Sequence, residues 1–181
     1  MTLVIAIALY VCAASIFGCV HGQHSQQSCP SVLKAIKDIL CDCKKTKCDA
    51  GWIEYNNHCY FFSVDKRNWT ESDQYCKDHS SYLAKVEDQN ENQWILSKAN
   101  QQGYSPGHIL FLGGNDLQKE GHWVWSVDSS PLSYQPWDYV WKEPNGGTRE
   151  NCLNLMSSAY DGRWNDYPCD LSLHYVCEKE K

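Results

Sequence analysis

The chain has 181 residues, a formal net charge of −6 at pH 7, and eleven cysteines. This length bounds the protein to one globular domain plus a short additional segment. The acidic balance argues against nucleic-acid binding, which needs a basic face, and is compatible with binding a cation.

Residues 1–22 begin with an apolar, uncharged run that has the length of a signal-peptide core with its flanks. Small residues precede Gln23, so cleavage is expected after Gly22, with Gly18 as the alternative. A lipoprotein signal ending at Cys19 is disfavoured because no basic residue precedes the apolar run. No other stretch approaches the ~20 apolar residues of a membrane span. The sequence therefore predicts a secreted, extracellular protein without an anchor.

The cysteine content also indicates an oxidising compartment. Removal of Cys12 and Cys19 with the signal peptide leaves nine of the eleven cysteines. These are Cys29, Cys41, Cys43, Cys48, Cys59, Cys76, Cys152, Cys169 and Cys177. Because nine is odd, at least one thiol is free or pairs with another chain.

Residues 23–47 start polar and continue into a short amphipathic helix. Its apolar side chains recur at helical spacing: Val32, Leu33, Ile36, Ile39 and Leu40. Isolated helices shorter than ~12–15 residues are marginal, so this apolar stripe needs a partner. One interpretation is docking onto the chain's own domain. The other, favoured by the odd cysteine count, is a homodimer linked by a disulfide through Cys29, Cys41 or Cys43. A metal cluster on Cys41, Cys43 and Cys48 is disfavoured in a secreted chain.

The composition becomes that of a globular domain from Gly51 onward. Residues 52–62 predict a hairpin that turns at Asn56-Asn57. Capping patterns predict helices from Thr70 to about Asp78 and from Asp88 to about Gln101. Five further apolar segments predict strands, at residues 108–112, 123–127, 152–156, 162–165 and 173–177. Residues 128–150 contain three prolines and a glycine pair, and so long an irregular loop is usually functional.

Acidic and amide side chains gather in this loop and in one later strand. Glu143, Asn145 and Glu150 lie in the loop, and Asn165 and Asp166 follow some fifteen residues later. If Cys152 pairs with Cys169, the two segments lie side by side. All five side chains offer oxygen, which suits Ca²⁺ with its 6–8 oxygen ligands. Zinc would require His or Cys ligands. Without a cation, three neighbouring carboxylates would repel one another.

The order of these groups also suits a sugar. Glu143 with Asn145, and Glu150 with Asn165, each combine an acceptor-only carboxylate with an amide that can donate. A hydroxyl bound to Ca²⁺ can donate to the carboxylate and accept from the amide, which satisfies it fully. Two such pairs match two neighbouring hydroxyls.

These residues resemble the C-type lectin domain. The resemblance covers Cys48 to Glu178 and is carried by Glu143-Pro144-Asn145, Glu150, Trp164-Asn165-Asp166, the FLGGND stretch at 111–116 and the framing cysteines. It implies an α+β fold at residues 48–181, with two helices packed on small antiparallel sheets and a long irregular calcium-binding loop. The implied disulfides are Cys76–Cys177, Cys152–Cys169 and, as in the long form of the domain, Cys48–Cys59.

The resemblance also implies that Glu143, Asn145, Glu150, Asn165 and Asp166 bind both Ca²⁺ and sugar, and that the bond before Pro144 is cis. The E-P-N order resembles mannose-type members, which bind sugars with equatorial 3- and 4-hydroxyls: mannose, glucose, N-acetylglucosamine and fucose. Galactose-binding members usually show Q-P-D here.

Three departures from the family pattern affect these expectations. The spacing from Glu143 to Glu150 is one residue shorter than in many relatives, and the segment before Glu143 is about two residues longer. That segment holds Trp137, Tyr139 and Trp141, which either stack on a sugar or pack the loop. Asp116 and Glu120 match the auxiliary calcium site of the family, but Gly146 stands where an aspartate often lies and Asn151 replaces another, so the resemblance implies this second site only in part.

Asn68-Trp69-Thr70 is an N-glycosylation sequon, although Thr70 can instead serve as a helix cap. Cys76 and His79 do not suggest a catalytic pair, because Cys76 belongs to the disulfide frame. A glycosidase acid pair at Glu143 and Glu150 is disfavoured, since general-acid catalysis needs one carboxyl kept neutral by burial.

The sequence thus predicts a calcium-dependent lectin for mannose-type glycans in defence or cell-surface recognition, and no catalytic residues. The alternative is the same fold binding a protein partner without sugar.

Overall fold

The computed structural model describes residues 47–104 and 107–181, except for the side chains of His108 and Ser158. The expected signal peptide, the amphipathic helix, and Cys29, Cys41 and Cys43 lie outside the described residues. Among the residues that are described, no helix is long and apolar enough to cross a membrane.

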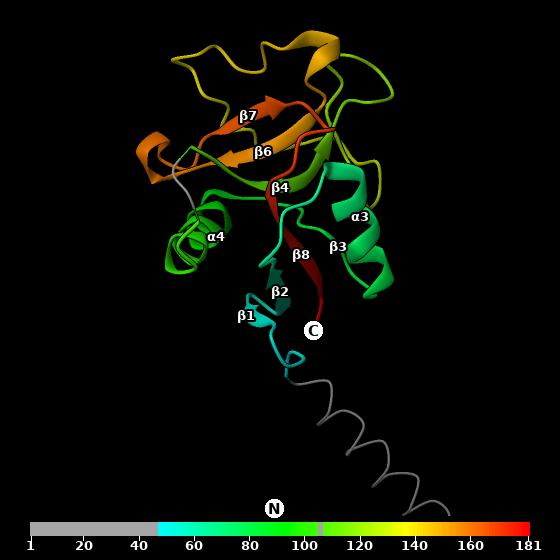
Figure 1. The fold of residues 1–181 in the computed structure, drawn as a ribbon, viewed down its shortest axis with the longest axis vertical. Coiled ribbons are helices and arrows are strands. Elements are labelled where there is room, and N and C mark those ends of the chain that lie inside the picture. Colours follow the sequence, from blue (N-terminus) through cyan, green and yellow to red (C-terminus); the bar gives the residue numbers. More distant parts are fainter. Residues whose placement is uncertain (1–46, 105–106) are drawn as a thin grey trace, which may run out of the picture. The chain divides into compact units, whose positions relative to one another are not determined.

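The strands form one sheet in the order β1-β2-β8-β4-β6-β7, with β3 paired to β8 and β5 paired to β4 (Figure 1). Their bounds are Ile53–Tyr55 (β1), His58–Phe62 (β2), Tyr82–Leu83 (β3), His108–Asn115 (β4), Val124–Trp125 (β5), Cys152–Met156 (β6), Trp164–Tyr167 (β7) and His174–Glu180 (β8). One ladder departs from the expected antiparallel pairing, because β4 and β8 run parallel. A parallel pair needs a long connection, and residues 116–173 provide it.

The β1–β2 hairpin turns at Asn56 and Asn57, as the sequence predicts. Both residues have positive φ, 43° and 68°, which suits the twist of a two-residue hairpin turn. The expected strand at 123–127 is shorter in the structure, since β5 holds only Val124–Trp125.

The N-cap of helix α3 (Trp69–Asp78) lies two residues earlier than predicted. It is Asn68, whose Oδ1 accepts the Glu71 backbone N–H at 2.8 Å, so Thr70 is not the cap. Trp69 is buried, and its Nε1 donates to the Leu112 carbonyl at 2.9 Å. This tertiary contact places the first turn of the helix against β4.

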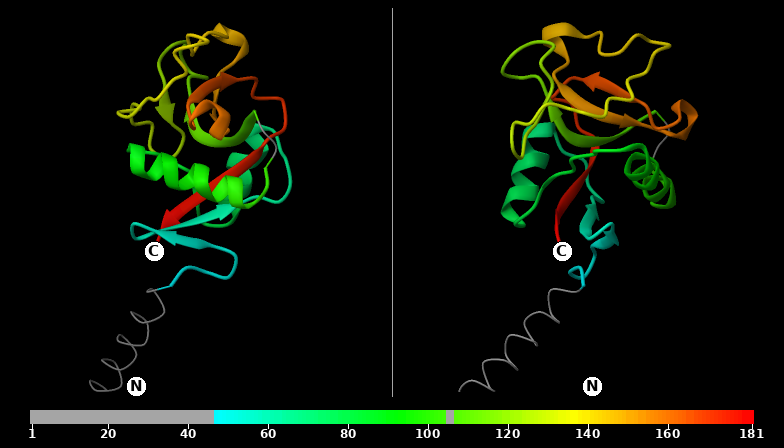
Figure 2. Two further views of the ribbon diagram at one scale, coloured as in Figure 1. Left: turned by 90° about the vertical axis from the view of Figure 1, so that its left-hand side faces the viewer. Right: turned by 180° about the vertical axis from the view of Figure 1, so that it is seen from behind.

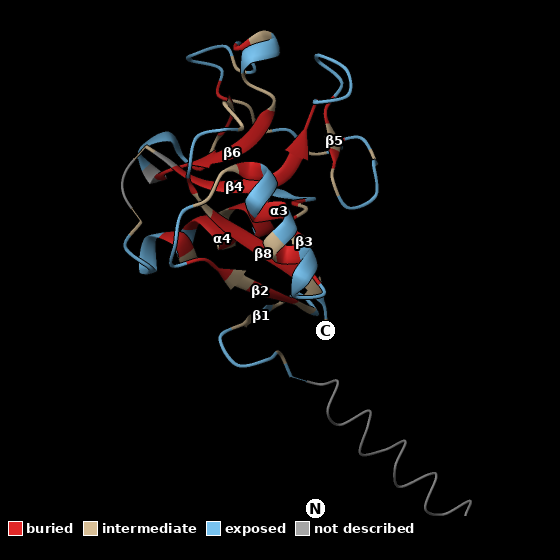
Figure 3. Cartoon of the chain, turned by 45° about the vertical axis from the view of Figure 1, so that its right-hand side comes forward, coloured by how far each residue is buried: buried red, intermediate tan, exposed pale blue. Residues whose placement is uncertain are grey.

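Helix α4 (Gln89–Gln101) begins where the sequence predicts. Asp88 is its N-cap, and the Asp88 Oδ1 accepts the Glu91 backbone N–H at 2.9 Å. Figure 1 shows α3 and α4 on opposite flanks of the sheet. Figure 3 shows that β4, β6 and β8 between them are buried, whereas the loop tips are exposed.

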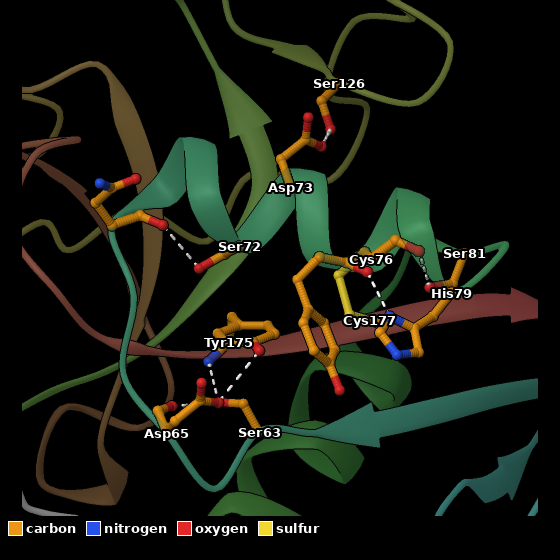
Figure 4. Close-up of a disulfide and its surroundings, with 12 residues drawn as sticks. Ser63, Asp65, Ser72, Asp73, Cys76, His79, Ser81, Ser126, Tyr175 and Cys177 are labelled. Atoms are coloured by element: carbon orange, nitrogen blue, oxygen red, sulfur yellow. Dashed lines mark hydrogen bonds between the residues drawn. A yellow bond between two sulfur atoms is a disulfide. The ribbon is translucent and has the colours of Figure 1, made fainter.

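All three disulfides implied by the resemblance are present: Cys48–Cys59, Cys76–Cys177 and Cys152–Cys169. Figure 4 shows Cys76 of α3 bonded to Cys177 of β8, and the Ser126 hydroxyl donating to Asp73 at 3.1 Å. In the chain-entropy account, closing a loop of about 100 residues stabilises the fold by about 4–5 kcal/mol. The disulfide therefore fixes α3 to the centre of the sheet.

The loop at residues 128–150 lies at the end of the domain away from the β1–β2 hairpin (Figure 2). Trp137 anchors it by packing edge-on against Trp123 and Trp164, at centroid distances of 4.9 and 6.0 Å. The backbone follows the same path, because Asp138 N donates to the Trp164 carbonyl at 2.9 Å. Trp137 is therefore a packing residue, and the loop is held next to the start of β7.

Candidate calcium and sugar site

A compact turn leads into the acidic cluster, and Asp138 organises it. The buried Asp138 carboxylate accepts the backbone N–H groups of Val140 at 2.6 Å and Trp141 at 3.1 Å. The Asp138 carbonyl accepts the Glu143 N–H at 2.8 Å and closes the turn. Sequence reasoning did not identify Asp138, although an aspartate two residues before a turn amide is a known turn former.

Glu143 follows this turn and forms the first wall of the site. Its bond to Pro144 is cis, as the resemblance implies. Burial, then the adjacent Asp166 carboxylate, raises the pKa of Glu143 to about 8. The Glu143 Oε2 is buried and has no hydrogen-bond partner. Two carboxylates can share a hydrogen bond only when one is protonated, so Glu143 and Asp166 need either a proton or a cation.

Asp166 of β7 lies at the centre of the cluster and is 1% exposed. Its Oδ1 accepts the Asn145 N–H at 3.1 Å, and its Oδ2 accepts the Gly146 N–H at 2.7 Å. Asp166 pairs with Leu153 across the β6–β7 ladder. The sheet therefore fixes the carboxylate that, in turn, fixes the loop backbone.

The two amides lie on either side of Asp166. The Asn145 Nδ2 donates to the Trp141 carbonyl at 2.9 Å, and the Asn165 Nδ2 donates to the Asp166 carbonyl. Each amide nitrogen carries two donors, so one N–H of each is left for another acceptor. Glu143 and Asn165 line the same cavity, which has a volume of about 240 Å³.

Glu150 follows a short 3₁₀ helix, η1 (Gly147–Arg149), and its backbone N–H donates to the Gly147 carbonyl at 2.9 Å. Its side chain lies against Gly146, where a Cβ would come within 2.3 Å of the Glu150 Cβ. Only glycine fits this close approach. The aspartate that the resemblance leads one to expect at position 146 is therefore incompatible with this position of Glu150.

The residues fit a hard cation only as a mixed set. Within residues 47–104 and 107–181, no three His, Cys, Asp or Glu side chains form a metal-binding group by themselves. Glu143 and Asp166 supply adjoining carboxylates, and the unpartnered Glu143 oxygen is a position that a cation would satisfy. With Asn145, Glu150 and Asn165 as further oxygen donors, the chemistry matches Ca²⁺.

The residues of the expected auxiliary site are only partly assembled. Asp116 is buried, its Oδ2 accepts the Gly121 N–H at 2.8 Å, and its Oδ1 has no hydrogen-bond partner. Burial, then the charge of Asp166, raises the pKa of Asp116. Glu120 is exposed, and the Asn151 Nδ2 donates to the Thr148 carbonyl at 3.1 Å. A second ion at Asp116 and Glu120 stays a prediction.

The comparisons with known proteins identify the family. Residues 65–179 match the family described as "Lectin C-type domain". A "Perlucin-like protein" of Mytilus galloprovincialis is 36% identical over 136 residues, which cover 72% of this chain and 81% of the relative. The chain belongs to the C-type lectin domain family, a lectin family that is generally non-enzymatic.

Solved structures share the fold. The carbohydrate-recognition domain of the mouse scavenger receptor C-type lectin is 30% identical, with a TM-score of 0.64, and the match covers 75% of this chain and 99% of that one. A calcium-independent type II antifreeze protein is 25% identical, with a TM-score of 0.63, and the match covers 74% and 95%. The fold therefore occurs in a protein whose description includes sugar recognition and in one described as independent of calcium.

Proposed function

We propose that this protein is a secreted lectin that recognises mannose-type glycans in a calcium-dependent manner. The observation that carries the proposal is the arrangement around Asp166. Its carboxylate holds the backbone of Asn145 and Gly146 and lies beside Glu143, whose buried oxygen has no protein partner. A purely structural loop would not leave two carboxylates facing each other, because their charges repel.

In this proposal Ca²⁺, when bound, supplies the positive charge that the carboxylates share and a coordination position for sugar hydroxyls. The chain's own groups complete the recognition. Glu143 and Glu150 accept hydrogen bonds from two neighbouring hydroxyls, and the remaining N–H groups of Asn145 and Asn165 donate to the same hydroxyls. The cis bond before Pro144 lies between the first carboxylate and the first amide.

The resemblance of Glu143-Pro144-Asn145 to mannose-type members supports the sugar class: mannose, glucose, N-acetylglucosamine and fucose. Recognition of such glycans on other cells or microbes is the proposed role. Titration calorimetry with methyl α-mannoside and methyl α-galactoside, each in Ca²⁺ and after EDTA, tests the proposal. Heat from the mannoside alone, abolished by EDTA, is expected. Equal binding of both sugars, or binding that survives EDTA, contradicts it.

A second candidate function keeps the fold without sugar. The calcium-independent antifreeze relative and the lack of a three-carboxylate group among the described residues favour this reading. It predicts a protein partner whose binding is unaffected by EDTA or by mannoside. Competition by methyl α-mannoside against a captured partner distinguishes the two functions.

Two modifications complete the proposal. The three disulfides use six of the nine mature cysteines and leave Cys29, Cys41 and Cys43. A disulfide-linked homodimer through one of them would raise avidity by presenting two sites. N-glycosylation at Asn68 is compatible with helix capping, since the cap uses Oδ1 and the glycan would attach to Nδ2. Gels with and without reductant, and with and without glycosidase, test both.

A further inference from the structure

A groove lined by aromatic residues continues from the proposed sugar site. Trp141 and Tyr160 are 62% and 38% exposed. Both line the cavity of about 240 Å³ that also contacts Glu143 and Asn165. Both also line a neighbouring cavity of about 480 Å³, which extends to Arg163. Because the two cavities share these rings, a ligand that leaves the primary site meets Trp141 and Tyr160 next.

The Trp141 wall of the groove is rigid and is linked to the primary site. The Trp141 backbone N–H donates to Asp138 Oδ1 at 3.1 Å, and its carbonyl accepts the Asn145 Nδ2 at 2.9 Å. Asp138 itself is 2% exposed. The ring is thus presented on a turn that is fixed before any ligand arrives, which lowers the entropic cost of binding.

The opposite wall is the connection between β6 and β7, which contains a second 3₁₀ helix, η2 (Ser158–Tyr160). Its backbone is held by the Tyr160 N–H, which donates to the Ser157 carbonyl at 2.9 Å. The Arg163 N–H donates to the Tyr160 carbonyl at 3.1 Å. The Arg163 guanidinium lies 4.2 Å from the ring centroid of Tyr139 and so joins the two walls.

The chemistry of the groove matches a pyranose ring. The faces of exposed aromatic rings are electron-rich and accept the C–H face of a sugar. Asp161 and Arg163, which line the outer cavity, offer an acceptor and donors for hydroxyls at the ring edge. A wholly apolar ligand would leave these polar groups without partners. The opposite charges of Asp161 and Arg163 favour a neutral sugar over an acidic one.

We propose that the groove over Trp141 and Tyr160 is a subsite for a second, neutral sugar residue of an oligosaccharide whose terminal residue occupies the primary site. This inference rests on the proposed lectin function. It goes beyond that function because it makes the protein selective for glycan chains over single sugars. The segment before Glu143 supplies the exposed ring.

Calorimetry in Ca²⁺ tests the subsite by comparing methyl α-mannoside with α-linked mannotriose. The wild-type protein is expected to bind the trisaccharide about five- to tenfold more tightly, the scale of one aromatic stacking contact. Trp141→Ala keeps both backbone hydrogen bonds of residue 141, but the Trp141 ring also lines the primary cavity, so the effect of this variant is measured as the ratio of the two affinities. It should lose most of the preference for the trisaccharide, as should Tyr160→Ala, and Trp141→Phe should retain it.

Val64→Ala is the matched control, because Val64 is 87% exposed and lies outside the groove. It should change neither affinity. A wild-type protein that binds both ligands equally overturns the subsite and leaves the lectin function intact. A Trp141→Ala variant that weakens both ligands equally also overturns it, because the residue would then act through the primary site. If the wild-type protein binds neither ligand in Ca²⁺, both the proposed function and the subsite fail.

Discussion

Gly146 donates its backbone N–H to Asp166 Oδ2 at 2.7 Å, so a buried carboxylate of β7 holds the loop at a residue twenty positions earlier in the chain. Asn145 donates to the other oxygen of the same carboxylate at 3.1 Å. Asp166 therefore has two roles in the proposed site. It positions the segment that carries Glu143 and Asn145, and it supplies charge to the cation.

Substitution of Asp166 by Asn tests whether the charge of this residue is needed for calcium binding. Asn keeps the size of the side chain but removes the charge, and its amide group cannot accept both backbone N–H groups. Calcium affinity is expected to fall at least about tenfold, because the variant loses both the charge and a hydrogen bond that holds the loop. A hydrogen bond to a charged group is worth roughly 1.5–3 kcal/mol. A calcium titration monitored by calorimetry measures the affinity.

Asp170→Asn is the control for the Asp166 substitution, because Asp170 is exposed and lies outside the cluster. It should leave calcium affinity unchanged. Equal calcium affinity in Asp166→Asn and the wild-type protein would show that no ion binds at this carboxylate.

Gly146→Ala tests the close approach of Glu150. The backbone of Gly146 has φ −76° and ψ −16°, which alanine adopts without strain. The added Cβ would come within 2.3 Å of the Glu150 Cβ, so Glu150 must move. We expect calcium and sugar affinity to fall by about tenfold, and the melting temperature in EDTA to fall as well, because the Glu150 Cβ can move only together with its backbone.

Thr148→Ala, at a neighbouring exposed position of η1, is the control for Gly146→Ala. Affinity that stays at the wild-type level in both variants would mean that the position of Glu150 is irrelevant to the site.

Features of the fold that depend on neighbouring residues could be predicted from the sequence. The turn at Asn56-Asn57 and the cap at Asp88 depend on neighbouring residues, and both are where the sequence predicts them. The start of α3 is not where the sequence predicts it, because the local capping box of Asn68 and Glu71 competes with the pattern that begins at Thr70. The parallel pairing of β4 with β8 depends on segments far apart in the chain.

The candidate site shows the same division. Residue types and spacing indicated the five oxygen-bearing side chains. Asp138 was missed although its contacts with Val140 and Trp141 are local and typical of a turn. The sequence could not separate the aromatic residues, of which Trp137 packs in the loop and Trp141 is exposed, because the packing of Trp137 depends on tertiary contacts.

The identity of the sugar is tested by exchanging the loop residues for the galactose pattern. The double variant Glu143→Gln with Asn145→Asp moves the carboxylate from one side of Pro144 to the other and reverses the order of donor and acceptor. Preference for methyl α-mannoside over methyl α-galactoside is expected to fall by about tenfold or invert, because each hydroxyl would meet the wrong partner. Competition binding in Ca²⁺ measures the ratio, and an unchanged ratio would show that these residues do not set sugar choice.

A buried carboxylate far from the site gives a prediction on stability. Glu178 of β8 is 1% exposed, accepts the Lys85 N–H at 2.8 Å and contacts His58. Burial raises its pKa from 4.5 to about 7. Between these two pKa values the folded state holds a proton on Glu178 that the unfolded state has released. The contribution of Glu178 to stability is therefore full below pH 4.5 and is lost as the pH rises through 7.

Glu178→Gln should remove this dependence. The difference in unfolding free energy between wild type and variant should change by roughly 1–3 kcal/mol between acid and neutral pH, to the disadvantage of wild type at pH 7. Urea denaturation across this range measures it. The control is Glu180→Gln, an exposed carboxylate of the same strand that also faces His58. Parallel pH profiles for wild type and Glu178→Gln would contradict the prediction.

The most direct test of the central claim is retention of the mature protein on mannose–agarose in Ca²⁺, with galactose–agarose in parallel and elution by EDTA. Retention on mannose with release by EDTA is the predicted result. Retention only on galactose would contradict the proposed sugar class. Passage through both columns, or retention on mannose that EDTA does not reverse, would contradict a calcium-dependent mannose lectin.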